Sequence, residues 1–379
     1  MKVVIAPDSF KGSLNAIAVA RAMEKGILQV DPTIQTRLIP MADGGEGTVD
    51  AVVTALGGSI VPVRVSGPSG IPVESFYGVL PDSKTAVIEL AAASGLNLLS
   101  VAERNPLWTT SYGFGELIKK ALDDGARKLI LGIGGSATND GGVGMARALG
   151  VKFLDRNAGE IAPGGGNLSE LDRIDASGLD DRLTRTDIVV ACDVTNPLCG
   201  PQGASAVYGP QKGATPEMVT RLDRNLCHYG ECLARSTGHA VKDIPGAGAA
   251  GGVGAALMAF LGAKLLPGAQ IIMDIAELDR VLDGANFVLT GEGRTDKQTQ
   301  FGKVPMAIAS KAVNHHIPVV CLSGAITEDA ASLYAYGFSG IFSIVEGPIS
   351  LDEAMQETAP LLERAAERIL RLFLAGIKR

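Results

Sequence analysis

Residues 128–142 read KLILGIGGSATNDGG, and this stretch indicates the class of fold. Its first six residues form a short apolar run of the kind that makes a buried strand. The next nine, GGSATNDGG, hold four glycines among hydroxyl, amide and carboxylate side chains. In open parallel sheets, ligands bind outside the carboxyl ends of the strands. We therefore expect an α/β fold in which this loop binds a ligand.

Both ends of the chain repeat this alternation of apolar runs and helical patterns. Five strands with helices between them predict one doubly wound parallel sheet. The strands are expected at 3–6, 36–39, 287–289, 318–322 and 342–345, and the helices at 13–30, 47–56, 304–313, 328–334 and 352–374.

The middle of the chain has a different pattern. Runs at 60–65, 72–80 and 85–90 are separated by Gly, Pro and Asp turns and predict antiparallel strands. We interpret this part as a second, mixed α/β domain inserted into the first, so that the domains are 1–60 with 283–379, and 61–282. Its further strands are expected near 128–133, 151–154 and 188–191, and its helices near 115–123, 216–236 and 253–261.

The composition argues against several classes of partner. The chain has 379 residues and a formal net charge of −7 with both signs scattered, so we expect no nucleic-acid or membrane partner. Five cysteines without a C-x-x-C spacing and the lack of a signal sequence before the first strand predict a cytoplasmic protein with reduced thiols. The uncharged segment 246–263 predicts a glycine loop that leads into a buried helix rather than a membrane span.

Six loops at predicted strand ends combine glycine with acidic or hydroxyl residues. Successive N–H groups in glycine turns suit phosphate. Carboxylates beside such turns indicate a divalent cation between the acid and the phosphate, with Mg²⁺ as the expected ion. The loops are DSFKGS (8–13), ADGGEGT (42–48), GGSATNDGG (134–142), CDVTNP (192–197), GEGRTD (291–296) and SG (323–324).

Other interpretations stay open for single loops. The segment 43–46 could be a helix N-terminus, Asp193 a turn cap and Lys11 a solvated loop lysine. GIGGSA (132–137) after a strand matches the dinucleotide-binding fingerprint, which keeps an NAD-dependent dehydrogenase open. A non-enzymatic small-anion binding protein is a third hypothesis. The sequence contains neither a Walker A loop nor the HRD and DFG motifs of protein kinases.

Six segments together resemble the bacterial type I glycerate kinase family in their order and spacing. They are APDSFKGS (6–13), ADGGEGT (42–48), GGSATNDGG (134–142), CDVTNPLCGPQGA (192–204), YGPQKGA (208–214) and GEGRTDKQTQFGKVP (291–305). The resemblance implies Mg²⁺-dependent transfer of the γ-phosphoryl group of ATP to D-glycerate at the 2-hydroxyl, with the 3-hydroxyl left open. It also implies a discontinuous flavodoxin-like domain and an inserted α/β domain that face each other across an interdomain cleft.

Phosphoryl transfer needs positioning and charge stabilisation more than covalent help, and this assigns roles to the loop residues. Glycerate is a carboxylate, so a guanidinium or a lysine should hold it. In the flavodoxin-like strand order 2-1-3-4-5, residues 8–11 should lie beside 292–296. The predicted ATP-phosphate ligands are Gly134, Gly135, Ser136, Thr138, Asn139 and Gly141; the catalytic residues Asp193, Asp296 and Lys11; the metal ligands Asp193, Asp43 and Glu292, with Asp140 as a further carboxylate; and the substrate ligands Arg294, Lys303, Asp8 and Ser9.

The expected partners are therefore small molecules, namely ATP and glycerate, with Mg²⁺ as the cofactor. The sequence leaves open whether the chain forms a homo-oligomer.

Overall fold

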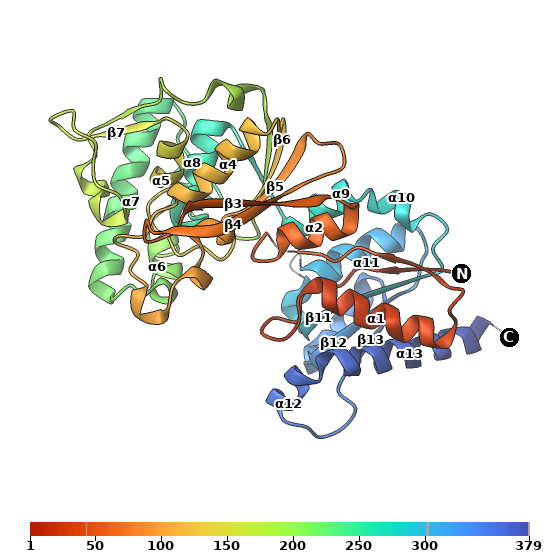
Figure 1. The fold of residues 1–379 in the computed structure, drawn as a ribbon. Helices are drawn as coiled ribbons and strands as arrows, with labels where there is room; N and C mark the ends of the chain where they lie inside the picture. Colours follow the sequence, from red (N-terminus) through yellow and green to blue (C-terminus); the bar gives the residue numbers. More distant parts are fainter. Residues whose placement is uncertain (43, 301–302, 378–379) are drawn as a thin grey trace. The chain divides into compact units, whose positions relative to one another are not determined.

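The chain forms two compact units in the computed structural model, which describes residues 1–42, 44–300 and 303–377 (Figure 1). Both units are α/β, as the sequence predicts. The domain boundaries expected at 60/61 and 282/283 stay a prediction. Unit 1 comprises Met1–Ala42, Asp50–Gly57 and Ala269–Arg379, and unit 2 comprises Asp43–Val49 and Gly58–Gly268.

Unit 1 is built on a five-stranded parallel sheet with the strand order β13-β12-β11-β1-β2. In chain order this is the 2-1-3-4-5 arrangement of flavodoxin-like sheets, so the predicted doubly wound sheet is confirmed. The strands are β1 (Lys2–Ile5), β2 (Gln35–Leu38), β11 (Phe287–Thr295), β12 (Val319–Ile326) and β13 (Phe338–Ser343). The helices are α1 (Ala16–Val30), α2 (Thr48–Leu56), α9 (Gly268–Ile275), α10 (Leu278–Leu282), α11 (Val304–Asn314), α12 (Leu351–Gln356) and α13 (Thr358–Ile377), with the 3₁₀ helices η6 (Lys297–Gln300) and η7 (Glu328–Tyr336). The first residues of α2, up to Val49, and of α9, Gly268, are assigned to unit 2.

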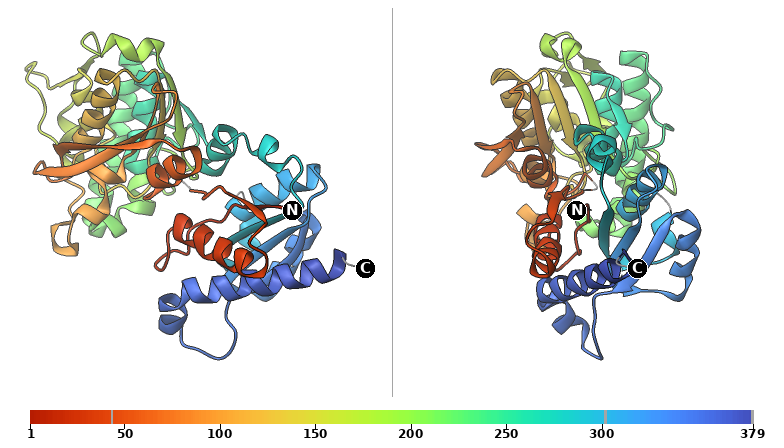
Figure 2. Two further views of the ribbon diagram at one scale, coloured as in Figure 1. Left: turned by 45° about the vertical axis from the view of Figure 1, so that its right-hand side comes forward. Right: turned by 90° about the vertical axis from the view of Figure 1, so that its right-hand side faces the viewer.

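Apolar side chains on both faces of this sheet are buried. Val3 and Ile5 of β1 belong to one apolar cluster with residues of α1 and α13, which lie side by side along the sheet (Figure 2). Val4, between them, is equally buried and points to the opposite face. A strand buried on both faces has no polar alternation, which explains why β1 is a continuous apolar run.

Unit 2 contains a six-stranded mixed sheet with the order β10-β9-β6-β5-β4-β3. Its first three strands along the chain are antiparallel, as predicted, and β5, β6, β9 and β10 run parallel. The strands are β3 (Ser59–Ser66), β4 (Pro72–Val79), β5 (Thr85–Glu89), β6 (Lys128–Gly132), β7 (Lys152–Leu154), β8 (Arg173–Asp175), β9 (Asp187–Ala191) and β10 (Lys264–Leu266). The helices are α3 (Ala91–Ser94), α4 (Tyr112–Asp123), α5 (Val143–Ala148), α6 (Ala204–Tyr208), α7 (Pro216–Thr237) and α8 (Ala249–Leu261).

Helix α8 contributes to two apolar clusters of unit 2. Val253 packs with Phe114 of α4 and Leu131 of β6, whereas Ala255 belongs to a second cluster with Tyr229 of α7. The uncharged segment 246–263 therefore contains a buried helix, as predicted. No helix among the described residues is long and apolar enough to span a membrane.

Three differences from the predicted elements have physical causes. The sequence predicts a loop at 291–296, but β11 continues to Thr295 because Gly291 and Arg294 pair with β12, and tertiary pairing overrides weak strand propensity. The run at 151–154 forms β7, which pairs only with β8 in a two-stranded hairpin outside the main sheet. Strands β8 and β10 have three residues each, too few to show a period in the sequence.

The substitution Gly26→Ala tests the close packing of α1 on α13. A Cβ at Gly26 would lie 2.1 Å from the carbonyl oxygen of Glu363 in α13. Gly26→Ala should therefore lower the free energy of unfolding by about 1–3 kcal/mol, although alanine favours helix. Gly376→Ala in α13 is the control, because nothing lies within 4 Å of its Cβ position. The control should raise stability by about 0.5–1 kcal/mol. Urea unfolding measures both, and wild-type stability of Gly26→Ala would contradict this packing.

Candidate functional site

Three of the predicted loops meet within unit 2. The N–H of Gly134 donates to the carbonyl oxygen of Gly44 (2.9 Å). A Cβ on Gly134 would lie 2.7 Å from the Cα of Gly45, and a Cβ on Gly44 would lie 2.7 Å from the Cβ of Ala191 at the end of β9. Backbone contacts that require glycine therefore bring the loops 42–48, 134–142 and 192–197 together. Asp43, a predicted metal ligand, lies outside the described residues.

The carboxylate of Asp140 organises the 134–142 loop from inside. Asp140 is 1% exposed. Its Oδ2 accepts the N–H and the hydroxyl of Ser111 (both 2.9 Å) and the N–H of Gly144 (3.1 Å). Its Oδ1 accepts the N–H of Gly142 (3.1 Å). Four protein donors already bind this carboxylate, which therefore orders the start of α5; its expected role as a carboxylate for the metal stays a prediction.

Two glycines predicted to offer N–H groups to phosphate use them inside the protein. Gly134 donates to Gly44, and Gly141 donates to the carbonyl oxygen of Gly251 (2.9 Å). Gly141 has a left-handed φ of +67°, and a Cβ there would lie 2.7 Å from the ring of Tyr229. These glycines permit a tight turn and close packing. Their contact with ATP stays a prediction, but their N–H groups are already engaged.

The other predicted N–H groups of the loop are available as donors. Backbone N–H groups are strong donors that folded proteins rarely leave without an acceptor. Successive N–H groups in turns are able to form anion-binding concavities. Within residues 1–42, 44–300 and 303–377, no acceptor binds the N–H groups of Gly135, Ser136, Thr138 and Asn139.

The side chain of Asn139 has one unsatisfied atom. Its Nδ2 donates to the hydroxyl of Ser205 in α6 (2.9 Å), whereas its Oδ1 is buried and has no hydrogen-bond partner among the described residues. A buried acceptor without a donor needs a bound molecule or a water to satisfy it. This unsatisfied Oδ1 lies in the same loop as the N–H groups that have no acceptor among the described residues.

A lysine that the sequence does not single out lies against this loop. Lys212 ends the 3₁₀ helix η5 (Pro210–Lys212) and is 2% exposed. Its Nζ donates to the Oγ of Ser136 (2.7 Å) and to the carbonyl oxygen of Thr138 (2.6 Å). Burial lowers the pKa of Lys212 to about 7, and the negative charge of Asp140 opposes this change. The sequence gives one indication of Lys212, because it is the one cationic residue in the motif YGPQKGA (208–214).

Two further acids at strand ends of unit 2 bind backbone N–H groups. Glu89, at the end of β5, is buried and accepts the N–H groups of Gly47 (3.1 Å) and Val49, so it holds the 42–48 loop. Sequence analysis missed Glu89, although an acid that ends the apolar strand TAVIE (85–89) is an available signal. Asp193, after β9, accepts the N–H of Gly268 through its Oδ1 (2.9 Å).

The predicted segments 8–13, 291–296 and 323–324 of unit 1 lie side by side, but 291–295 and 323–324 belong to the strands β11 and β12 and are not loops after them. The N–H of Asp8 donates to the carbonyl oxygen of Gly291 (2.8 Å), and the N–H of Ser9 donates to the Asp8 carboxylate (2.7 Å). A Cβ on Gly293 would lie 3.5 Å from the Cα of Phe10. Residues 8–11 therefore lie beside 292–296, as the strand order predicts.

Four side chains of unit 1 form an acid–lysine cluster, which we define as Glu292, Arg294, Asp296 and Lys303. The Nζ of Lys303 lies 3.6 Å from the Oε2 of Glu292 and 3.7 Å from the Oδ1 of Asp296. The Nε of Arg294 lies 3.6 Å from the Oδ2 of Asp296. Arg294 is 67% exposed, so its guanidinium is accessible to a ligand. Lys11, in the neighbouring loop, is also exposed.

Glu292 is the buried member of this cluster. Its Oε1 accepts the hydroxyls of Thr295 (3.0 Å) and Thr299 (2.7 Å). Burial raises the pKa of Glu292, although the Thr299 hydroxyl and the ammonium of Lys303 act in the opposite direction. The carboxylate thus orders the segment that follows β11. Its predicted role as a metal ligand stays a prediction.

No group of three or more His, Cys, Asp or Glu side chains is placed to hold a metal ion within the described part of the chain. Mg²⁺ is commonly held by one or two carboxylates together with phosphate oxygens, so it does not require a cage made by the protein alone. Of the predicted ligands, Asp193 lies in unit 2 and Glu292 in unit 1.

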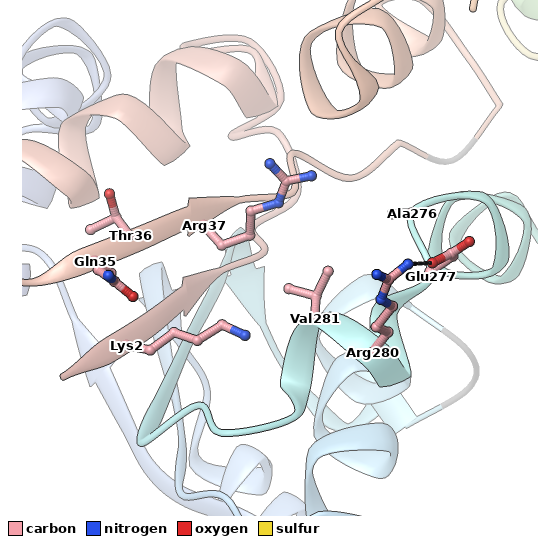
Figure 3. A pocket seen from close by; sticks show the side chains of 8 residues that line it. All are labelled: Lys2, Gln35, Thr36, Arg37, Ala276, Glu277, Arg280 and Val281. Atoms are coloured by element: carbon pink, nitrogen blue, oxygen red, sulfur yellow. Dashed lines mark hydrogen bonds and ion pairs between the residues drawn. The ribbon is translucent and has the colours of Figure 1, made fainter. Parts of the chain in front are cut away.

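A cavity of about 610 Å³ in unit 1 lies apart from these predicted residues (Figure 3). Lys2, Arg37 and Arg280 extend from β1, β2 and α10 around it, and Arg280 pairs with Glu277 (3.0 Å). None of the predicted site residues that the structure describes lines this cavity. Its lining residues are Lys2, Gln35, Thr36, Arg37, Ala276, Glu277, Arg280 and Val281.

Comparison with known proteins decides the family. The model of the glycerate kinase family matches residues 3–374. The chain belongs to the glycerate kinase family. It is 50% identical over 369 residues to the glycerate kinase of Bacillus subtilis, and this match covers 97% of each chain. It is 49% identical over 378 residues to the glycerate 2-kinase of Escherichia coli, covering 100% of this chain and 99% of that protein.

A solved structure agrees with this assignment. The crystal structure of a putative glycerate kinase 2 from Salmonella typhimurium LT2 has a TM-score of 0.90, is 48% identical and covers 100% of both chains. The resemblance seen in the six motifs is therefore confirmed, and the chain is a kinase.

The topology of this kinase argues against the dinucleotide-binding interpretation. That fingerprint needs a strand, a helix and a second strand parallel to the first. After β6, however, the next strand in the chain is β7, which pairs antiparallel with β8. The parallel partners of β6 are β5 and β9. GIGGSA (132–137) therefore does not open a dinucleotide-binding unit.

Asp140→Asn tests the internal support of the loop. The amide keeps the shape of the carboxylate, but its NH2 group replaces either Oδ2, which accepts from Ser111 and Gly144, or Oδ1, which accepts from Gly142, so a donor faces a donor in either orientation. We expect the free energy of unfolding to fall by about 2–4 kcal/mol. Asp181→Asn is the control, because the Asp181 side chain is 88% exposed. It should change stability by no more than about 0.5 kcal/mol. Equal urea midpoints for the two variants would contradict the role of Asp140.

Proposed function

We propose that this chain transfers the γ-phosphoryl group of ATP to the 2-hydroxyl of D-glycerate and forms 2-phosphoglycerate and ADP. The relative named glycerate 2-kinase supports the 2-hydroxyl, and the 3-hydroxyl is the alternative. One observation carries the proposal. The loop after β6 combines four available N–H groups with a buried ammonium, which suits the phosphates of a nucleotide.

The loop of unit 2 holds the ATP phosphates in this proposal. The N–H groups of Gly135, Ser136, Thr138 and Asn139 point their positive ends toward phosphate oxygens and stabilise the charge that develops during transfer. Asp140 and Glu89 keep the loops in shape through backbone N–H groups. The preorganised donors need no rearrangement when the phosphates bind.

The acid–lysine cluster of unit 1 holds glycerate in this proposal. The exposed guanidinium of Arg294 presents paired donors that match a carboxylate, and Lys11 and Lys303 add positive charge. Asp296 lies beside both cations and accepts the proton of the substrate hydroxyl. Asp8 and Ser9 add polar groups on the adjacent loop.

Magnesium supplies neutralising charge between the β- and γ-phosphates when it is bound with the nucleotide. Asp193 is the better-placed ligand among the described candidates, because it lies at the end of β9, next to the loops that hold the phosphates. Glu292 is less suited, because the ammonium of Lys303 lies 3.6 Å from its Oε2.

Coupled ADP release with D-glycerate, with and without Mg²⁺, tests the reaction. Phosphorus NMR of the product then distinguishes 2-phosphoglycerate from 3-phosphoglycerate. We expect Mg²⁺-dependent turnover and the 2-phosphate. Absence of turnover in both conditions would overturn the proposal and favour a small-anion binding protein. A fluorescence change of a nicotinamide cofactor would favour a dehydrogenase instead.

Arg294→Lys tests the carboxylate site. A lysine keeps the charge but loses the paired donors, so we expect KM for glycerate to rise about 10-fold with little change in kcat. Arg280→Lys is the matched control in unit 1, because Arg280 lies outside the acid–lysine cluster, and it should leave both constants unchanged. Steady-state kinetics measures these constants. An unchanged KM in Arg294→Lys would show that another cation holds glycerate.

A further inference from the structure

The turn that carries Lys212 is fixed by backbone packing. Lys212 lies between α6 and α7, and the following Gly213 has a left-handed φ of +89°. A Cβ on Gly213 would lie 2.4 Å from the carbonyl oxygen of Arg104. Only glycine fits this approach, so the backbone holds the lysine at one position relative to the 134–142 loop.

Both hydrogen-bond partners of Lys212 belong to the segment with available N–H groups. An ammonium has three donors, and two of them bind the Oγ of Ser136 and the carbonyl oxygen of Thr138. These two contacts flank Ala137, whose own N–H is bound to the carbonyl oxygen of Ser94 (2.9 Å). The lysine therefore fixes the orientation of the peptide groups that face a ligand.

The charge of Lys212 has no close partner. Within the described residues, no carboxylate oxygen lies within 4.0 Å of its Nζ. Asp140 is the charged group that faces it, and four protein donors already bind that carboxylate. A buried charge without a paired carboxylate opposes folding. Ionisable groups perturbed in this way are concentrated at functional sites, and a bound anion would supply the missing partner here.

The geometry points to Lys212 as a positioning residue for the nucleotide phosphates, which orients the 135–139 peptide groups and places a positive charge behind them. This inference rests on the proposed function, because it needs a nucleotide at this loop. Lys212 acts through the loop, since its side chain is buried and touches Ser136 and Thr138.

A pH dependence follows from this arrangement. Burial lowers the pKa of Lys212 to about 7 in the chain without ligand. Bound phosphate favours the charged form and raises this pKa. Between about pH 7 and the higher pKa of the complex, the lysine is largely neutral before binding and charged after it. Nucleotide binding therefore takes up a proton in this range, and affinity falls as the pH rises.

Calorimetry of MgADP binding measures this uptake directly. The titrations use the whole chain at about pH 8, above the second pKa of phosphate groups, in two buffers of different ionisation enthalpy. The variants are Lys212→Met, which removes the charge, and Lys212→Arg, which keeps a charge that does not titrate. Lys152→Met, at an exposed lysine of β7, is the control.

We expect the wild type and Lys152→Met to take up a substantial fraction of a proton for each nucleotide. Lys212→Met should bind MgADP about 100-fold more weakly, without proton uptake. Lys212→Arg should recover much of this affinity, also without uptake. Circular dichroism checks that each variant is folded, and the wild-type titration tests the inference even where a variant does not fold.

The possible results distinguish failure of the inference about Lys212 from failure of the proposed function. Wild-type turnover and MgADP binding without proton uptake would overturn the role of Lys212 and leave the proposed function intact. A folded Lys212→Met variant with wild-type affinity for MgADP and wild-type proton uptake would also overturn the role of Lys212 and leave the proposed function intact. If the wild type neither binds MgADP nor phosphorylates glycerate, both the inference and the proposed function are wrong.

Discussion

Two buried ionisable side chains, Asp140 and Lys212, hold the 134–142 loop from within, and the candidate site of unit 2 depends on them. Asp140 accepts donors from Ser111, Gly142 and Gly144, whereas Lys212 donates to Ser136 and Thr138. Asp140 takes two of its four hydrogen bonds from Ser111 at the start of α4 and two from Gly142 and Gly144. Both hydrogen-bond partners of Lys212 belong to the loop itself. A loop held in this way keeps its N–H groups in one arrangement, because moving a peptide group would leave a buried charge unsatisfied.

The composition of this loop first indicates that its glycines bind phosphate through their N–H groups, but two of them are required for close packing instead. Gly134 and Gly141 have their N–H groups bound within the protein, and a Cβ on either would meet a neighbouring segment. Their small size therefore matters because two loops approach at backbone distance. The N–H groups without an acceptor among the described residues belong to Gly135 and to three residues with side chains, since an N–H group does not require glycine to bind phosphate.

The sequence was sufficient to predict the parallel sheet of unit 1 and the antiparallel strands of unit 2, because burial on one or both faces leaves a local pattern. It was not sufficient to predict the end of β11, whose polar residues are strand only through pairing with β12. The candidate loops were recognisable from glycine and acid spacing. The roles of Lys212 and Glu89 were not, because their partners lie 74–76 and about 40 residues away in the chain. Long-range contacts of this kind leave no period in the sequence.

The two units differ in the cation that each offers to a ligand. In unit 2 the buried Lys212 hydrogen-bonds to Ser136 and Thr138 and suits an anion. In unit 1 the buried group is the carboxylate of Glu292, whose pKa is raised and whose cationic neighbour Lys303 is shared with the more exposed Asp296. Lys303 therefore lies near both carboxylates and does not pair with either of them alone. The buried Lys212 of unit 2 and the exposed guanidinium of Arg294 in unit 1 are the cations that support the proposed anionic ligands, although the whole chain carries a net negative charge.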